Sequence, residues 1–89
     1  HPRELAIRMM HDHIVNDLLS IAKQFESLHQ SSPELWHNRV QTEMRQFLQV
    51  QRQHPPFQRF CQLYNVDPEM FIAEVLKSAT QQLGGTHSN

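Results

Sequence analysis

The first third of the chain has the hydrophobic periodicity of one long amphipathic helix. Its large apolar residues recur at steps of three and four positions, namely Ile7, Met10, Ile14, Leu18, Ile21, Phe25 and Leu28. At about 100° per residue these positions fall within an arc of about 80° on a helical wheel. Val15, Leu19 and Ala22 widen the apolar arc to about 180°, beyond the ~100° stripe of an ordinary surface helix. The pattern therefore predicts a helix over about 3–29 with neighbours on two sides.

A helix stop and a restart follow in the segment 31–34, Ser-Ser-Pro-Glu. Ser31 with Glu34 fits a capping box, whereas Ser32 with Pro33 fits an N-cap followed by proline at the first helical position. Either register begins a second helix at about 33. We expect it to end at about 53, because the His-Pro-Pro sequence at 54–56 does not continue a helix. One face of this helix is apolar, with Trp36, Val40, Met44 and Phe47.

Two shorter helices are predicted after the prolines. The apolar run from Phe57 to Tyr64 indicates a helix over about 56–64, closed by Asn65, a residue type that tolerates the left-handed conformation. Asp67 and Pro68 then form an N-cap with proline at the first helical position. The fourth helix runs over about 68–83, and two glycines end it.

The fold class that follows is all-α. No segment alternates with period two and no Asn-Gly type turn is present, so strands are not expected. Helices of about 27 and 20 residues joined by a short turn predict a long antiparallel hairpin, with the two shorter helices packed on it as a small bundle. The 89 residues correspond to a single helical domain over 1–85, with 86–89 as a disordered tail.

Composition narrows the compartment and the class of partner. A single cysteine cannot form an intramolecular disulfide, and no apolar run approaches the 18 residues of a membrane span, so we expect an intracellular protein, cytoplasmic or nuclear, without a membrane partner. Eight Lys and Arg against nine Asp and Glu argue against a general polyanion-binding module.

Catalytic chemistry is not indicated by the residue pattern. His11 and His13 lie about 200° apart on a helix and cannot share a metal ion, although His13 and Asp17 supply two ligands at i and i+4. Cys61 lies among aromatic residues, where a thiol is a small core residue, and two glycines at the end of the chain cannot form a phosphate loop. We therefore predict no enzyme activity, no catalytic, cofactor-binding or metal-binding residues, and no small-molecule substrate.

Three arginines form the main cationic feature. Arg45, Arg52 and Arg59 recur at seven-residue spacing inside 44–66, a stretch without acidic residues. The first two lie within about 20° of each other on the wheel, facing away from the apolar stripe. They suit charge-assisted, bidentate contacts with an acidic peptide or an RNA backbone, although an ordinary solvated helix face carries the same residues.

Apolar residues outside the expected core are the second indication of a partner. Leu5 and Met9 lie roughly opposite the main stripe of the first helix, and Met70 lies about 100° from the stripe of the last. His11 lies at the edge of the stripe, either as a hydrogen-bonded imidazole or as a pH-sensitive interface residue. With Val15 and Leu19 on the wide arc, these positions predict surface for a partner helix or a second copy of the chain.

The sequence thus favours a non-enzymatic protein–protein interaction or dimerisation domain of a larger regulatory or scaffold protein. The alternative is a nucleic-acid-binding domain that uses Arg45, Arg52 and Arg59. A helix-turn-helix formed by 56–64 and 68–83 is disfavoured, because Asp67, Glu69 and Glu74 would face the phosphates.

Overall fold

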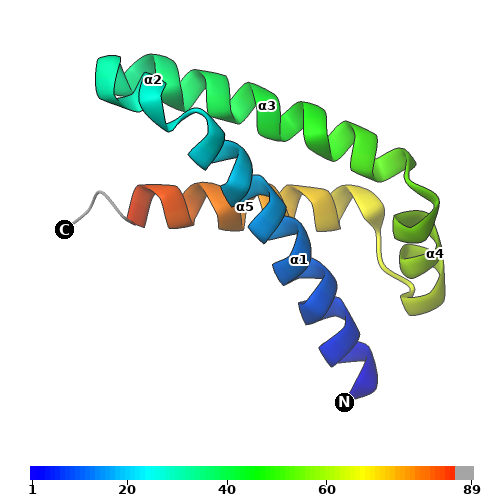
Figure 1. The fold of residues 1–89 in the computed structure, drawn as a ribbon. Helices are drawn as coiled ribbons and strands as arrows, with labels where there is room; N and C mark the ends of the chain where they lie inside the picture. The colour runs from blue at the N-terminus through cyan, green and yellow to red at the C-terminus, as the bar shows by residue number, and fades with distance from the viewer. Residues whose placement is uncertain (86–89) are drawn as a thin grey trace.

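The computed structural model describes residues 1–85 and, over that range, contains five helices and no strand. The helices are α1 (Pro2–Gln24), α2 (Glu26–Ser31), α3 (Pro33–Gln53), α4 (Pro55–Tyr64) and α5 (Pro68–Gly85), as Figure 1 shows. The predicted all-α bundle is confirmed. The predicted disordered tail, 86–89, lies outside the described residues.

The helix starts lie where the capping signals place them. The Ser32 hydroxyl accepts a hydrogen bond from the Leu35 backbone N–H at 3.3 Å, and Pro33 is the first residue of α3. Of the two registers that the sequence allowed, the structure therefore has the one with Ser32 as N-cap. At the start of α5, the Asp67 carboxylate accepts from the backbone N–H groups of the two residues after Pro68, at 2.9 and 3.4 Å.

Asn65 makes the sharp corner between α4 and α5. Its backbone has φ 54° and ψ 51°, the left-handed conformation predicted for a helix C-terminus. The Val66 N–H donates to the Cys61 carbonyl at 2.9 Å and closes the last turn of α4. The chain therefore turns sharply within the three residues that separate the two helices.

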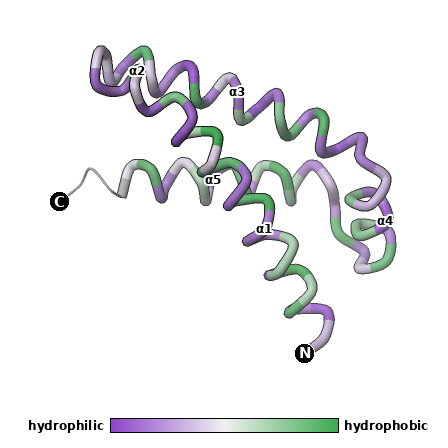
Figure 2. Tube along the Cα trace, in the orientation of Figure 1, coloured by the Kyte–Doolittle hydropathy of each residue, from purple (hydrophilic) through white to green (hydrophobic). Residues whose placement is uncertain are grey.

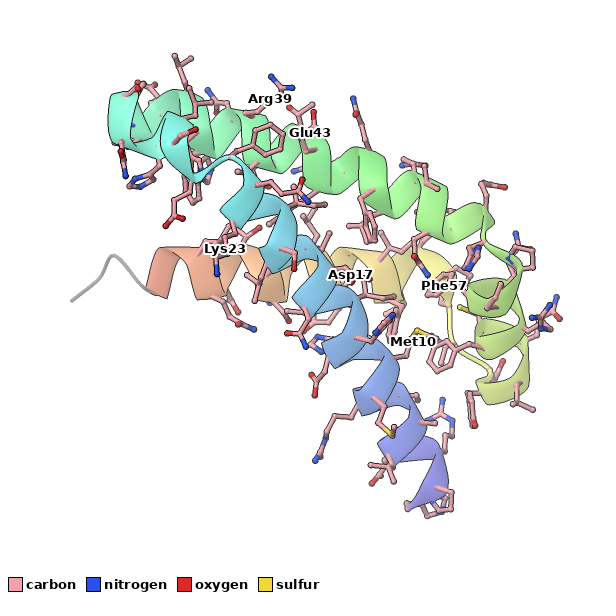
Figure 3. All side chains as sticks on the ribbon, in the orientation of Figure 1. Met10, Asp17, Lys23, Arg39, Glu43 and Phe57 are labelled. Carbon is pink, nitrogen blue, oxygen red and sulfur yellow. The ribbon has the colours of Figure 1, made fainter. Side chains whose placement is uncertain are left out.

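The predicted first helix, 3–29, differs from the structure because it is broken at Phe25. This residue has φ −103° and ψ 17°, and α2 begins immediately after it. Two tertiary contacts hold the break: the Arg39 guanidinium lies 4.9 Å from the centroid of the Phe25 ring, and the Trp36 indole donates to the Ala22 carbonyl at 3.3 Å. Arg39 is itself held by Glu43, to which it donates at 3.1 Å; both are labelled in Figure 3.

The break opens the predicted hairpin. From their junction at α2, α1 and α3 diverge, and α5 packs against both of them, more extensively against α1 (Figure 1). The shortest principal dimension of the molecule is 17 Å, which accommodates about two layers of helix. Each long helix therefore keeps a side that no other helix covers.

The core lies where the apolar stripes of α1, α3, α4 and α5 converge. Figure 2 shows the hydrophobic positions spaced along these helices and separated by hydrophilic ones. The largest fully buried side chains are Ile14, Leu18, Val40, Met44, Leu48, Phe57 and Val75. Phe57 comes from the short helix α4 and points toward the main body (Figure 3), where its ring lies 5.9 Å from that of Phe71.

Candidate functional site

The apolar residues predicted to contact a partner divide into exposed and buried groups. Leu5 and Met9 on α1 and Met70 on α5 are exposed, as expected for a contact surface. Leu19 is half-buried, and Val15 is only 3% exposed and belongs to the core. Val15 is therefore not accessible to a partner, because the wide arc of α1 is used to pack against both α3 and α5.

The three predicted arginines lie in different surroundings. Arg45 is exposed on α3, and Arg59 is exposed on α4. Arg52 forms an ion pair with Glu69, a residue at the start of α5. The arginines are therefore not one continuous cationic face, because an acidic side chain from another helix neutralises the middle one.

His11 links α1 to α5. Its Nε2 lies 3.1 Å from the Ser78 hydroxyl, its Nδ1 lies 3.2 Å from the Asp12 carboxylate, and its ring meets Phe71 edge-on. The order of serine, histidine and aspartate resembles a catalytic triad. Ser78 lies inside α5, however, where the surrounding backbone N–H groups bond to carbonyls one turn earlier and cannot stabilise an oxyanion. The His11 side chain, 26% exposed, thus acts as a polar link between two helices.

The site that the structure assembles is a groove between α3 and α5. Two polar contacts lie at its ends: the Gln41 amide donates to the Thr80 hydroxyl at 3.0 Å, and Arg52 pairs with Glu69. Because the first half of α3 faces the second half of α5, the two helices run antiparallel, as Figure 1 shows. The polar contacts fix their register and leave a hollow of about 480 Å³ along their length.

The groove has an apolar floor and polar banks. Leu48 from α3 and Ile72 and Leu76 from α5 form the floor. Leu48 is buried, whereas Ile72 and Leu76 remain partly exposed to solvent. The banks carry Arg45 and Gln49 on the α3 side, and Ala73, Lys77 and Gln81 on the α5 side.

The charge of the groove is positive. Glu69 is the acidic residue among those that line it, and its charge is offset by Arg52. Arg45 and Lys77 are both exposed, and neither makes an ion pair within residues 1–85. The groove therefore presents two uncompensated cations, one on each bank, above an apolar floor.

The sequence indicated this site only in part. Arg45 was identified from its spacing, but Leu48, Ile72 and Leu76 were not among the residues predicted to contact a partner. Ile72 and Leu76 lie to one side of the buried Phe71–Val75–Ala79 row on α5, which is the signal that a second contact surface exists. Only the antiparallel pairing of α3 with α5 shows that this side faces a groove.

A second, smaller hollow lies where α1, α2, α3 and α5 meet. It has a volume of about 280 Å³ and is lined by Leu19 and Trp36 among others, with Lys23 and Glu26 at its edge. Ligand pockets for small molecules occupy about 300–1,000 Å³ and bury most of the ligand. This hollow is just below that range, whereas the groove between α3 and α5 falls within it, so of the two the groove is the stronger candidate site.

Cys61 is buried on α4, where burial raises the pKa of its thiol and the negative charge of Asp67 raises it further. Above about pH 8.5 the unfolded chain loses the thiol proton while the folded chain keeps it. We therefore predict that the free energy of unfolding falls more steeply between pH 8 and 10 in the wild type than in Cys61→Ala, in urea titrations. Other titrating groups are common to both proteins. If the free energy of unfolding fell equally with pH in both, the buried environment of the Cys61 thiol would be contradicted.

Within the described part of the chain, no three His, Cys, Asp or Glu side chains are grouped so that they could hold a metal ion. None of the helices in that part is long and apolar enough to cross a bilayer. Comparison with protein-family models, with curated proteins and with solved structures gave no match to this chain.

Proposed function

We propose that this chain is a non-enzymatic protein–protein interaction domain whose binding site is the groove between α3 and α5. The observation that carries the proposal is an apolar floor, formed by Leu48, Ile72 and Leu76, whose two α5 residues stay partly exposed to solvent between two polar contacts. Grooves of this kind between helices receive an amphipathic helix of another chain.

The small size of the domain supports this proposal. At 89 residues the chain needs most of its large apolar side chains for its own core. Ile72 and Leu76 nevertheless remain partly exposed in a hollow rather than being covered by α4 or by the first helices. An apolar hollow with polar banks is typical of a surface that a partner covers.

Homodimerisation remains the second form of the same proposal. Leu5 and Met9 are exposed on the outer side of α1, away from the groove residues of α3 and α5. They form a small apolar surface that suits a second copy of the chain better than a deep docking site. Sedimentation across a dilution series from high to low micromolar protein distinguishes the two, since a dimer would show a mass near twice 10.5 kDa.

The nucleic-acid alternative has weaker support from the geometry. Arg52 is paired with Glu69, and Arg45 and Arg59 lie on separate helices. Few phosphate contacts would then be available, and affinity for nucleic acid rises with the number of phosphates neutralised. A role within a larger regulatory or scaffold protein fits a domain that binds and does not catalyse.

Site-specific photo-crosslinking tests the proposal. A photoreactive amino acid replaces Ala73, which is exposed on a bank of the groove, and in a matched protein it replaces Gln46, which is exposed on α3 outside the groove. In extracts of the source cells, we expect a discrete protein adduct at position 73 that is absent at position 46. Equal adducts at both positions, or none at 73, would contradict a binding site in the groove.

A further inference from the structure

We infer that the groove between α3 and α5 binds an acidic amphipathic helix of a partner protein. The inference rests on the proposed function and adds the chemistry of the partner. Three features of the groove define that chemistry: the apolar floor, the two uncompensated cations, and the absence of free backbone hydrogen-bonding groups along its walls.

The apolar floor of the groove determines the length and spacing of the apolar residues that a partner helix must present. The α5 wall runs from Glu69 to Gln81, which is about 18 Å or three turns of helix. A partner helix of similar length presents apolar residues at i, i+3 or i+4, and i+7, with the spacing of consecutive turns. Those residues would cover Ile72 and Leu76, which are partly exposed, and remove them from water.

The two uncompensated cations of the groove determine which charge the partner must carry. Arg45 on one bank and Lys77 on the other are exposed and lack ion pairs in the part of the chain that is described. The acidic residue at the groove, Glu69, is already paired with Arg52. A helix with Glu or Asp on both flanks of its apolar face would place carboxylates beside both cations, whereas a basic helix would be repelled from both banks.

The walls disfavour an extended peptide. Both walls are regular α-helices, whose backbone N–H and C=O groups are bonded within each helix. An extended strand would find no sheet edge to pair with and would leave its own backbone groups unsatisfied. A helix satisfies its backbone internally, and its polar flanks can accept hydrogen bonds from the side-chain amides of Gln49 and Gln81.

Fluorescence anisotropy with designed peptides tests this inference. The probe is a labelled synthetic helix of about five turns with leucines at i, i+3/i+4 and i+7 and glutamates on both flanks. Two matched probes carry lysines in place of the glutamates or alanines in place of the leucines. We expect the acidic probe to bind at least about tenfold more tightly than either, and more weakly as salt increases.

Charge reversal locates the binding site. The double variant Arg45→Glu/Lys77→Glu changes exposed residues that make no ion pair within residues 1–85. It should weaken the acidic probe about tenfold while leaving the far-UV circular dichroism unchanged. The matched control, Lys23→Glu/Arg59→Glu, reverses two exposed cations outside the groove and should leave affinity within about twofold. Equal losses in both double variants would show that only net charge matters and would overturn the inference.

Other outcomes separate this inference from the proposed function. Preference for the lysine probe, or no binding of the acidic probe up to about 1 mM, would overturn the acidic partner. If the photo-crosslinker at Ala73 still captured a protein, the groove would remain a docking site with another occupant. If a dimer in sedimentation dissociated in Arg45→Glu/Lys77→Glu, the occupant would be a second copy of this chain, which also overturns the inference.

Discussion

Replacing Phe57 with alanine is expected to lower the free energy of unfolding by about 3–5 kcal/mol. Phe57 is 1% exposed, and its ring lies 6.2 Å from that of Phe60 and 5.9 Å from that of Phe71. Together with Phe60, whose ring lies 5.4 Å from that of Phe71, it joins the short helix α4 to α5. Removing it leaves a cavity that α4, only 10 residues long, cannot fill without losing its own position.

The measurement is a urea titration followed by the fluorescence of Trp36, which is the only tryptophan in the chain. Phe57→Leu is the control, because it keeps most of the volume and should cost less than about 2 kcal/mol. Domains of this size have about 5–10 kcal/mol of stability, so the alanine variant should be marginal but the leucine variant fully folded. A loss below about 1 kcal/mol for the alanine variant would contradict the packing of α4 on α5.

Local chemistry explains what the sequence predicted well. Proline at the start of a helix and a hydroxyl or carboxylate just before it act within one turn of the chain. Asp67 could therefore be assigned as a cap without knowing the fold, and Ser32 could be named as one of two candidates. Asn65 is similar, because its left-handed backbone depends on the residue type and on its immediate neighbours. These positions mark the start of α3, the end of α4 and the start of α5.

Tertiary contacts explain what the sequence could not show. The break at Phe25 contains neither glycine nor proline, and the periodicity of apolar residues continues across it to Leu28. It depends on Arg39 and Trp36, which lie in the next long helix. A continuous helix was therefore the natural prediction, and the error propagated into the closed hairpin, which in the structure opens to admit α5.

For the candidate site too, features of a single helix could be predicted from the sequence, whereas features that depend on contacts between helices could not. Arg45 was predicted to be exposed because its position on the helical wheel lies away from the apolar stripe of its own helix. The pairing of Arg52 with Glu69 and the burial of Val15 depend on which helices meet, so neither followed from spacing. The groove itself is a property of two helices that are separated in the chain by residues 54–67, and its register is set by Gln41 and Thr80.

Trp36→Ala is expected to be the other strongly destabilising change, at about 3–5 kcal/mol. Trp36 is 8% exposed, its ring meets His29 edge-on at 4.6 Å, and its indole N–H donates to the Ala22 carbonyl. It thereby packs the start of α3 against the end of α1 at the break. Thermal unfolding followed by far-UV circular dichroism measures the loss, since the variant has no tryptophan fluorescence.

Trp36→Phe separates the hydrogen bond of the indole from the burial of its ring. The Ala22 carbonyl keeps a second donor, the Phe25 backbone N–H at 3.3 Å, so losing the indole donor leaves no buried acceptor unsatisfied. We expect Trp36→Phe to cost about 1–2 kcal/mol, the sum of one modest hydrogen bond and a small loss of volume. If it cost as much as Trp36→Ala, the hydrogen bond to Ala22 would be what holds α1 and α3 together at the break, and ring packing would be secondary.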